Sequence, residues 1–262
     1  MKELHLIPNR RNINESLALA EEYGAHFEYN EFFLPAVLDD AEEVRRIIDF
    51  YKSLDRDRSL DTLHGVFLDI TIHSDDRLVR EASDLRIHQS MDIARELGVK
   101  GVIFHTNTVP NFRTPSYLDN WVKRNSEYFR KLLDEYPQQE VYMENMFDEE
   151  PYTLARLAAD MKDVSRFGIC FDYAHANAFG DGSKAWSDAL MPYVKHMHIN
   201  DNDGAVDSHE SVGNGTIDWN AFNDRIHENN VMSSVLVEVT PLDRQSESLE
   251  FMKENHIYPF DE

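Results

Sequence analysis

The residues best suited to chemistry gather between His196 and Trp219, in the stretch HMHINDNDGAVDSHESVGNGTIDW. It holds three histidines, four aspartates and one glutamate. Imidazole nitrogens together with carboxylate oxygens are common ligands of zinc, manganese and iron. The stretch starts like a β-strand and ends at the start of a helix, so its acidic middle forms a loop. We therefore expect this loop to supply metal ligands.

Residues of the same types end six consecutive β-like runs. In chain order they are His64, His105, Glu144, Asp172, His198 and Glu238, while His175 follows Asp172 by three residues and Asp207 and His209 lie in the loop above. Four carboxylates crowded together would repel one another and raise their pKa values. No lysine or arginine stands at these strand ends to compensate. We expect one to three divalent ions instead, with zinc or manganese favoured and cobalt or magnesium as alternatives.

The elements that would position these residues alternate along the whole chain. β-like runs occur at Glu3–Ile7, His26–Tyr29, Thr62–Phe67, Gly101–His105, Glu140–Glu144, Phe167–Phe171, Lys195–Ile199 and Ser234–Val239. Helix-like stretches occur at Asn14–Tyr23, Ala41–Leu54, Arg77–Leu97, Ser116–Tyr136, Pro151–Met161, Ala185–Pro192, Asp218–Glu228 and Arg244–Glu254. Eight β–α units favour one α/β domain over residues 1–262, a (β/α)₈ TIM barrel, in which all strand ends meet at one mouth. A doubly wound open sheet is the alternative, but no GxGxxG follows the first run.

Local signals refine this outline. We expect Asn14 to cap the first helix, Gly24 and Gly98 to end helices, and Pro151 to sit in a first turn. We assign His196 to the helical side of its strand. Six other histidines are expected to have structural places only: His5, His26, His73, His88, His227 and His256.

Composition limits the possible partners and the compartment. Asp and Glu total 49 against 26 Lys and Arg, a formal charge of −23, which disfavours a nucleic-acid partner because such affinity comes largely from cationic side chains. Cys170 is the single cysteine, so no intramolecular disulfide can form. No secretory signal and no apolar run of membrane-spanning length is visible. We expect a soluble cytoplasmic protein, with homo-oligomers possible.

Three stretches, MENMFDEEP, FDYAHANAFG and the histidine-rich loop, resemble the xylose isomerase-like TIM-barrel superfamily. That superfamily contains sugar isomerases and epimerases as well as the endonuclease IV group (AP endonuclease family 2). Resemblance to the endonuclease pattern implies three zinc ions held by His64, His105, Glu144, Asp172, His175, His198, Asp207, His209 and Glu238. Resemblance to the isomerase pattern implies one metal held by Glu144, Asp172, His198 and Glu238.

Two departures weigh against duplex DNA as the substrate. The segment after His198 contains no Lys or Arg, and the His-Pro-Gly of the endonuclease pattern reads His105-Thr106-Asn107. We therefore favour a metal-dependent isomerase or epimerase of a sugar or sugar phosphate. Glu144 and Glu238 would act as acid and base, and His175 would contact a substrate hydroxyl or a second metal. Phe67, Asn145 and Asn107 are expected to contact the substrate.

Two alternatives stay open. The first is a multi-zinc phosphoesterase acting on abasic DNA or on a small phosphoester, which would use the full nine-residue set. The second is a non-catalytic barrel that binds a ligand through a metal.

Overall fold

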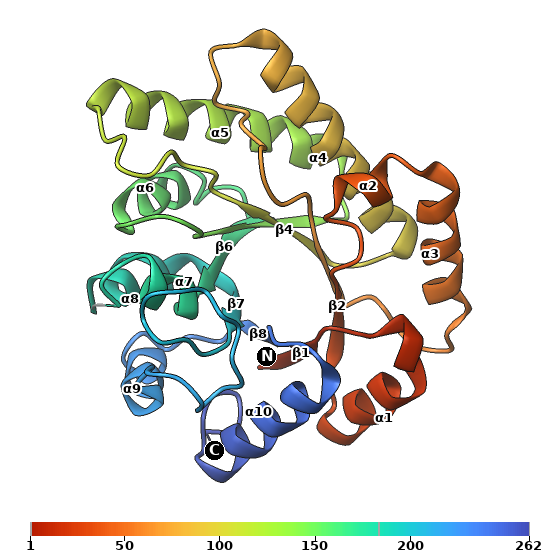
Figure 1. Ribbon diagram of the computed structural model, residues 1–262. Helices are drawn as coiled ribbons and strands as arrows, with labels where there is room; N and C mark the ends of the chain where they lie inside the picture. Colours follow the sequence, from red (N-terminus) through yellow and green to blue (C-terminus); the bar gives the residue numbers. More distant parts are fainter. Residues whose placement is uncertain (1, 183, 262) are drawn as a thin grey trace.

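The computed structural model describes residues 2–182 and 184–261 and forms a closed barrel of eight parallel strands (Figure 1). The strands are β1 (Glu3–Leu6), β2 (His26–Tyr29), β3 (Thr62–His64), β4 (Gly101–His105), β5 (Glu140–Glu144), β6 (Phe167–Asp172), β7 (Val194–Ile199) and β8 (Ser234–Val237). They follow one another in chain order, and β8 pairs with β1 to close the ring. The expected (β/α)₈ barrel is confirmed.

Helices surround the barrel on the outside (Figure 1). They are α1 (Ile13–Tyr23), α2 (Pro35–Leu38), α3 (Ala41–Ser53), α4 (Arg77–Leu97), α5 (Pro115–Glu135), α6 (Tyr152–Asp160), α7 (Tyr173–Ala178), α8 (Lys184–Leu190), α9 (Trp219–Glu228) and α10 (Leu242–Glu254), with 3₁₀ turns at Arg10–Asn12 and Met191–Tyr193. The short α2 and α7 were not expected from the sequence. In the described part of the chain, no helix has the length and apolar character needed to cross a membrane.

Two of the expected helix signals are wrong and two are confirmed. Asn14 lies inside α1, because the helix already begins at Ile13 with Asn12 in the cap position. Pro151 is the residue before α6 and not part of its first turn. Gly24 and Gly98 end α1 and α4 in the left-handed conformation, with φ of 64° and 75°, which glycine adopts without steric cost.

The inside of the barrel is unusually polar. Barrel interiors are typically filled by Val, Ile and Leu, but here the enclosed side chains include His5, Glu28, Thr62 and His196, each at most 1% exposed. His196 contacts Glu28 of β2, a strand that is not adjacent to β7, so its ring must cross the barrel interior. The expectation that His196 faces the helices is wrong, because residues two apart on a strand share a face. His196 therefore lies on the same side as His198, with ring centroids 5.2 Å apart.

Candidate metal centre

Six strand ends, helix α7 and the loop after β7 bring all nine candidate ligands together at the mouth of the barrel, in three groups. Group A is His64, His105 and Glu144; group B is Glu144, Asp172, His198 and Glu238; group C is His175, Asp207 and His209. Within each group, one potential ligand atom per residue lies within 4.8 Å of every other. Groups A and B share Glu144. The residue types predicted from the strand ends thus converge, and the structure adds the grouping.

Group B is the most deeply buried of the three. Its four side chains come from β5, β6, β7 and the residue after β8, and Glu144, Asp172 and His198 are completely enclosed. Nδ1 of His198 lies 3.2 Å from Oε1 of Glu144 and 3.1 Å from Oε2 of Glu238. The other oxygen of Glu144 faces group A, 3.2 Å from Nε2 of His105. Glu144 is therefore placed to bridge two ion positions.

Group C depends on the loop after β7, which folds around the buried carboxylate of Asp201. This carboxylate accepts hydrogen bonds from the amides of Gly213 and Ile217 and from the indole of Trp219, at 3.0, 3.2 and 2.9 Å. A Cβ at Gly215 would lie 2.2 Å from the same carboxylate, so only glycine fits there. The two glycines of the GNG turn therefore serve to enclose Asp201. The loop then presents Asp207 and His209 to His175, whose Nε2 is 3.2 Å from Oδ2 of Asp207.

Three of the histidines are oriented by backbone carbonyls. Nδ1–H of His64, His175 and His209 donates to the carbonyl oxygens of Gly65, Asn145 and Glu238, at 3.0, 2.8 and 2.7 Å. His209 adopts a φ of +45° in doing so, a region that non-glycine residues rarely enter. With Nδ1 committed to a carbonyl, Nε2 is the nitrogen of each ring that could bind a metal; in His175 and His209 it donates to Oδ2 of Asp207 until a metal displaces its proton. A fixed tautomer of this kind is typical of histidines that bind metal.

The donor atoms fit a set of divalent cations. Among the described residues, both oxygens of Glu144, Oδ2 of Asp172, Oε2 of Glu238 and Oδ1 of Asp207 are buried without a hydrogen-bond partner. Buried carboxylate oxygens without donors are costly, because such groups are normally hydrogen-bonded, paired or bound to metal. Mixed imidazole and carboxylate ligands suit zinc or manganese. The nine residues could hold up to three ions, one in each group.

Electrostatics show what an ion would replace. Burial lowers the pKa of His198, but Cys170 and the carboxylates of Glu144, Glu238 and Glu28 raise it well above its usual range. For His209, burial is likewise outweighed, here by Asp207 and Glu238, and the pKa rises to about 10. Burial, with the nearby carboxylates, raises the pKa of Asp172 to about 7. In the absence of a metal ion, protons on His198, His209 and Asp172 therefore offset the negative charge of these carboxylates.

Metal binding is accordingly expected to release protons and to tighten as pH rises. Each proton displaced from a histidine with a raised pKa makes the apparent dissociation constant about tenfold smaller per pH unit, as long as that histidine is protonated in the apoprotein. Calorimetric titration of the apoprotein with zinc, in buffers of different ionisation enthalpy between pH 6 and 8, measures the released protons directly. Binding without proton release across this range would contradict the assignment of His198 and His209 as ligands.

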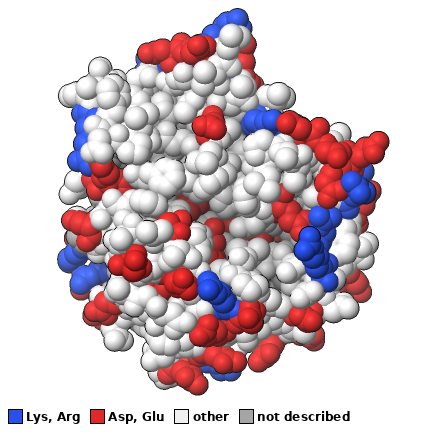
Figure 2. Space-filling model, viewed as in Figure 1, with Lys and Arg blue, Asp and Glu red and all other residues white. Residues whose placement is uncertain are grey.

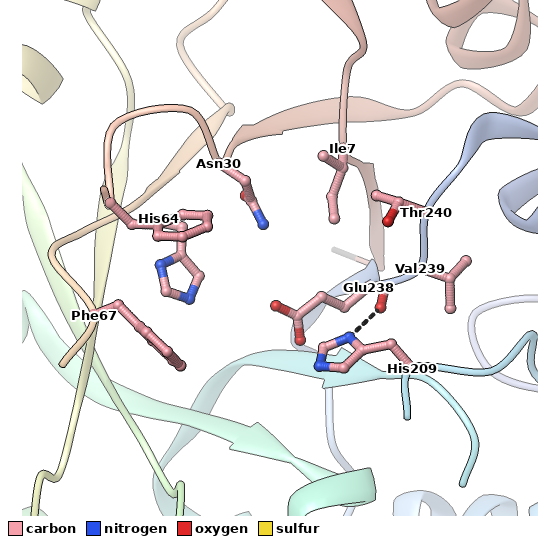
Figure 3. A pocket seen from close by; sticks show the side chains of 9 residues that line it. Ile7, Asn30, His64, Phe67, His209, Glu238, Val239 and Thr240 are labelled. Carbon is pink, nitrogen blue, oxygen red and sulfur yellow. Dashed lines mark hydrogen bonds between the residues drawn. The ribbon is translucent and has the colours of Figure 1, made fainter. Parts of the chain in front are cut away.

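A pocket at the mouth of the barrel includes candidate ligands in its lining (Figure 3). It has a volume of about 270 Å³ and is lined by one candidate ligand of each group, His64, Glu238 and His209, together with Ile7, Asn30, Phe33, Phe67, Val239 and Thr240. The carboxylate of Glu238 points into the space between His64, Phe67 and His209 (Figure 3). Among the described residues that line this pocket there is no Lys or Arg. Figure 2 shows acidic side chains on the floor of the central hollow, with lysines and arginines toward its rim.

The three residues expected to contact substrate have different places. Phe67 lines the pocket, and its ring lies edge-on to His105 with centroids 4.9 Å apart. Asn145 is buried, and its amide bonds the backbone N–H and C=O of Asp172 at 3.0 and 2.8 Å. Asn107 donates to the carbonyl of Phe67 at 3.2 Å. Asn145 and Asn107 therefore hold the loops that carry the candidate ligands and do not line the pocket.

Sequence reasoning missed Glu28 and Asn30, both on or just after β2. Asn30 lines the pocket, and its side-chain oxygen is buried without a hydrogen-bond partner. Glu28 lies beneath group B, within 3.1 Å of His198. Neither residue was recognisable as part of a site from the sequence. The segment HFEYN has the alternating pattern of an ordinary β-strand, and Glu28 lies in the middle of that strand.

Another cluster, Cys170, His196 and His198, also brings ligand-type atoms within 4.8 Å. Both ring nitrogens of His196 already have partners, Ser234 at 2.7 Å and Glu28 at 3.1 Å. This cluster therefore offers no open set of ligand atoms.

Comparison with known proteins places this geometry in context. A family model described as xylose isomerase-like TIM barrel matches residues 17–255. A probable endonuclease 4 of Geobacter sp. (strain M21) is 27% identical over 182 residues, covering 61% of this chain and 62% of that protein. The chain spans 62% to 68% of the length of the relatives that it matches by sequence.

Two solved structures share the fold across nearly the whole chain. The TTHB071 protein from Thermus thermophilus, soaked with ZnCl₂, superposes with a TM-score of 0.73 at 23% identity and covers 97% of each chain. A D-tagatose 3-epimerase-like protein superposes with a TM-score of 0.73 at 20% identity, covering 97% of this chain and 96% of that one.

Proposed function

We propose that this chain, which belongs to the xylose isomerase-like TIM-barrel family, is a metal-dependent phosphoesterase that hydrolyses a small-molecule phosphoester. One observation carries the proposal: nine ligand-type side chains form three groups, two of them joined through Glu144. An isomerase with one metal would need group B alone. It gives no role to the five side chains that complete groups A and C, which are His64, His105, His175, Asp207 and His209.

Charge balance supports an anionic substrate when all three groups are filled. Three divalent ions bring six positive charges to a site with four ligand-type carboxylates, Glu144, Asp172, Asp207 and Glu238, and with the buried carboxylate of Glu28 beside His198. The surplus attracts a phosphate group, which no Lys or Arg of the pocket lining could neutralise. A single ion would leave a net negative site, which suits a neutral sugar better. The number of bound ions therefore decides the substrate class.

The size of the pocket favours a small molecule over a nucleic acid. A volume of about 270 Å³ is at the lower end for small-ligand pockets. The strongly acidic chain lacks the cationic footprint that polyanion binding requires.

The chain's own side chains suggest how the reaction would proceed. Bound divalent ions would supply Lewis-acid polarisation and water activation. Glu238 is the one candidate ligand carboxylate that lines the pocket, so its oxygen can accept the proton of the attacking water. The rings of Phe33 and Phe67, with centroids 6.0 Å apart, shield one wall from solvent. Glu238 would then pass that proton to the departing oxygen, which leaves as an alcohol, and the side-chain oxygen of Asn30 can accept a hydrogen bond from that alcohol.

A sugar epimerase or isomerase is the second candidate, on one specific observation. Glu144 and Glu238 both approach Nδ1 of His198, at 3.2 and 3.1 Å, so two carboxylates flank the group B position. Two such groups could remove and return a proton at the carbon beside a carbonyl. In this case Glu144 and Glu238 would be acid and base.

Metal content separates the two candidates. We expect about three zinc or manganese ions per chain by mass spectrometry, with hydrolysis of small phosphomonoesters or phosphodiesters. Replacing His105 or His209 by alanine should remove about one ion each and reduce phosphoester turnover by roughly 100-fold or more, because each histidine completes one group. His88→Ala, a partly exposed histidine on α4, is the matched control.

Two results would contradict the phosphoesterase proposal. One ion per chain, retained in both alanine variants, together with solvent deuterium exchange beside the carbonyl of a ketose, would favour the epimerase and refute the phosphoesterase. A protein that binds no divalent ion after reconstitution would overturn both candidates.

A further inference from the structure

A buried carboxylate lies beneath the candidate metal centre without being one of its ligands. Glu28, on β2, is fully enclosed in the barrel interior. Its Oε1 lies 3.1 Å from Nε2 of His198. Its Oε2 lies 3.1 Å from Nε2 of His196 and accepts a hydrogen bond from the hydroxyl of Thr62 at 2.7 Å. Neither β1 nor β2 supplies a candidate ligand of the described groups, and Glu28 of β2 instead contacts the candidate ligand His198.

These contacts fix which nitrogen of His198 carries the proton. An ionised carboxylate only accepts hydrogen bonds, so Nε2 of His198, facing Glu28, must bear its hydrogen. Nδ1 lies 3.2 and 3.1 Å from oxygens of Glu144 and Glu238 and carries the second proton of the ring in the absence of metal. A metal ion that displaces this second proton would meet the lone pair of Nδ1, while Glu28 keeps the hydrogen on Nε2. The same reasoning places a hydrogen on Nε2 of His196, whose Nδ1 lies 2.7 Å from the hydroxyl oxygen of Ser234.

The charge of Glu28 also needs a counterpart. None of the described lysines or arginines forms an ion pair with it, and its partners are a hydroxyl and two imidazoles. A buried anion needs a nearby positive charge, which the protonated ring of His198 supplies in the absence of metal. A divalent ion at Nδ1 of His198 would balance this charge through the imidazole ring, and the carboxylate in turn would make the ring a stronger donor.

We propose that Glu28 is a positioning residue that holds His198 as the Nδ1 ligand of group B and thereby sets the affinity of that group for its metal ion. The inference rests on the metal centre required by the proposed function. Glu28 contacts neither the pocket nor the substrate, so it acts through His198 alone.

The test isolates group B. In a His105→Ala/His209→Ala background, only group B keeps all its ligands, and the dissociation constant for cobalt or zinc is measured by competition with a chelator. Adding Glu28→Gln, which keeps the shape but removes the charge, should weaken binding about 10- to 100-fold. Glu28→Asp, whose carboxylate is one methylene further away, should give an intermediate loss. His5→Gln, a buried change in the barrel interior without contact to a candidate ligand, is the matched control and should change affinity less than threefold.

Each outcome has one meaning. If Glu28→Gln fails to fold, the Glu28→Asp comparison decides the question in its place. Unchanged affinity in the folded Glu28 variants, or equal weakening by His5→Gln, would overturn the positioning role while leaving the proposed function intact. A background protein that binds metal in group B poorly even with Glu28 present would instead count against the metal centre itself.

Discussion

Replacing Glu144 by glutamine is expected to empty one of the two ion positions that this residue joins, to weaken the other, and to lower the turnover number by roughly a thousandfold or more. The reason is the shared position of Glu144, with one oxygen 3.2 Å from His198 in group B and the other 3.2 Å from His105 in group A. A glutamine side chain keeps one oxygen but presents N–H groups on its other side, which cannot bind a cation. Metal analysis and steady-state kinetics with the best phosphoester substrate measure both effects.

Glu140→Gln is the matched control for this prediction. Glu140 begins the same strand, at the opposite end of the barrel, where it pairs with Lys195 at 3.0 Å. The control should keep its metal and its activity. If Glu144→Gln, shown to be folded by circular dichroism, retained three ions and full turnover, the bridging role of Glu144 and the phosphoesterase proposal would both fail.

The convergence of the candidate ligands was predictable because it follows from one geometric rule. Strand periodicity located the strand ends, and a parallel barrel places all C-terminal strand ends at one mouth. His64, His105, Glu144 and Asp172 are the last residues of their strands. The partition into three groups was not predictable from spacing, because Asp207 and His209 reach group C only through a loop folded around Asp201.

Supporting residues were harder to predict than candidate ligands. Glu28 is in the middle of β2, where a lone glutamate suggests a solvent-facing side chain; its burial depends on β2 lying across the barrel from β7. Asn145 follows Glu144 directly and resembles a substrate contact, but the β5–β6 pairing commits its amide to the backbone of Asp172. Both roles depend on contacts between strands, which sequence periodicity does not report.

Removal of the metal is expected to lower the melting temperature by roughly 10 °C. An ion present at a thousand times its dissociation constant contributes about 4 kcal/mol to the free energy of unfolding. For chains of similar size, each kcal/mol corresponds to about 2–4 °C. The structural reason is the set of buried carboxylate oxygens without donors, including both oxygens of Glu144. Differential scanning calorimetry of protein dialysed against chelator, compared with the reconstituted protein, measures the difference.

The effect of pH gives this prediction a second test with a definite sign. The pKa of His209 is raised from 6.5 to about 10 in the folded apoprotein, since Asp207 and Glu238 outweigh burial. A raised folded-state pKa stabilises the fold fully below 6.5, and this contribution is lost as pH rises toward 10. The melting temperature of the apoprotein should therefore fall over that range, while the metal-loaded protein, whose histidines are already deprotonated, should change less. In the Glu144→Gln variant, which should bind less metal, chelator should lower the melting temperature by a smaller amount. Equal pH profiles with and without metal would show that the ions do not replace these protons, and the three-group centre would have to be abandoned.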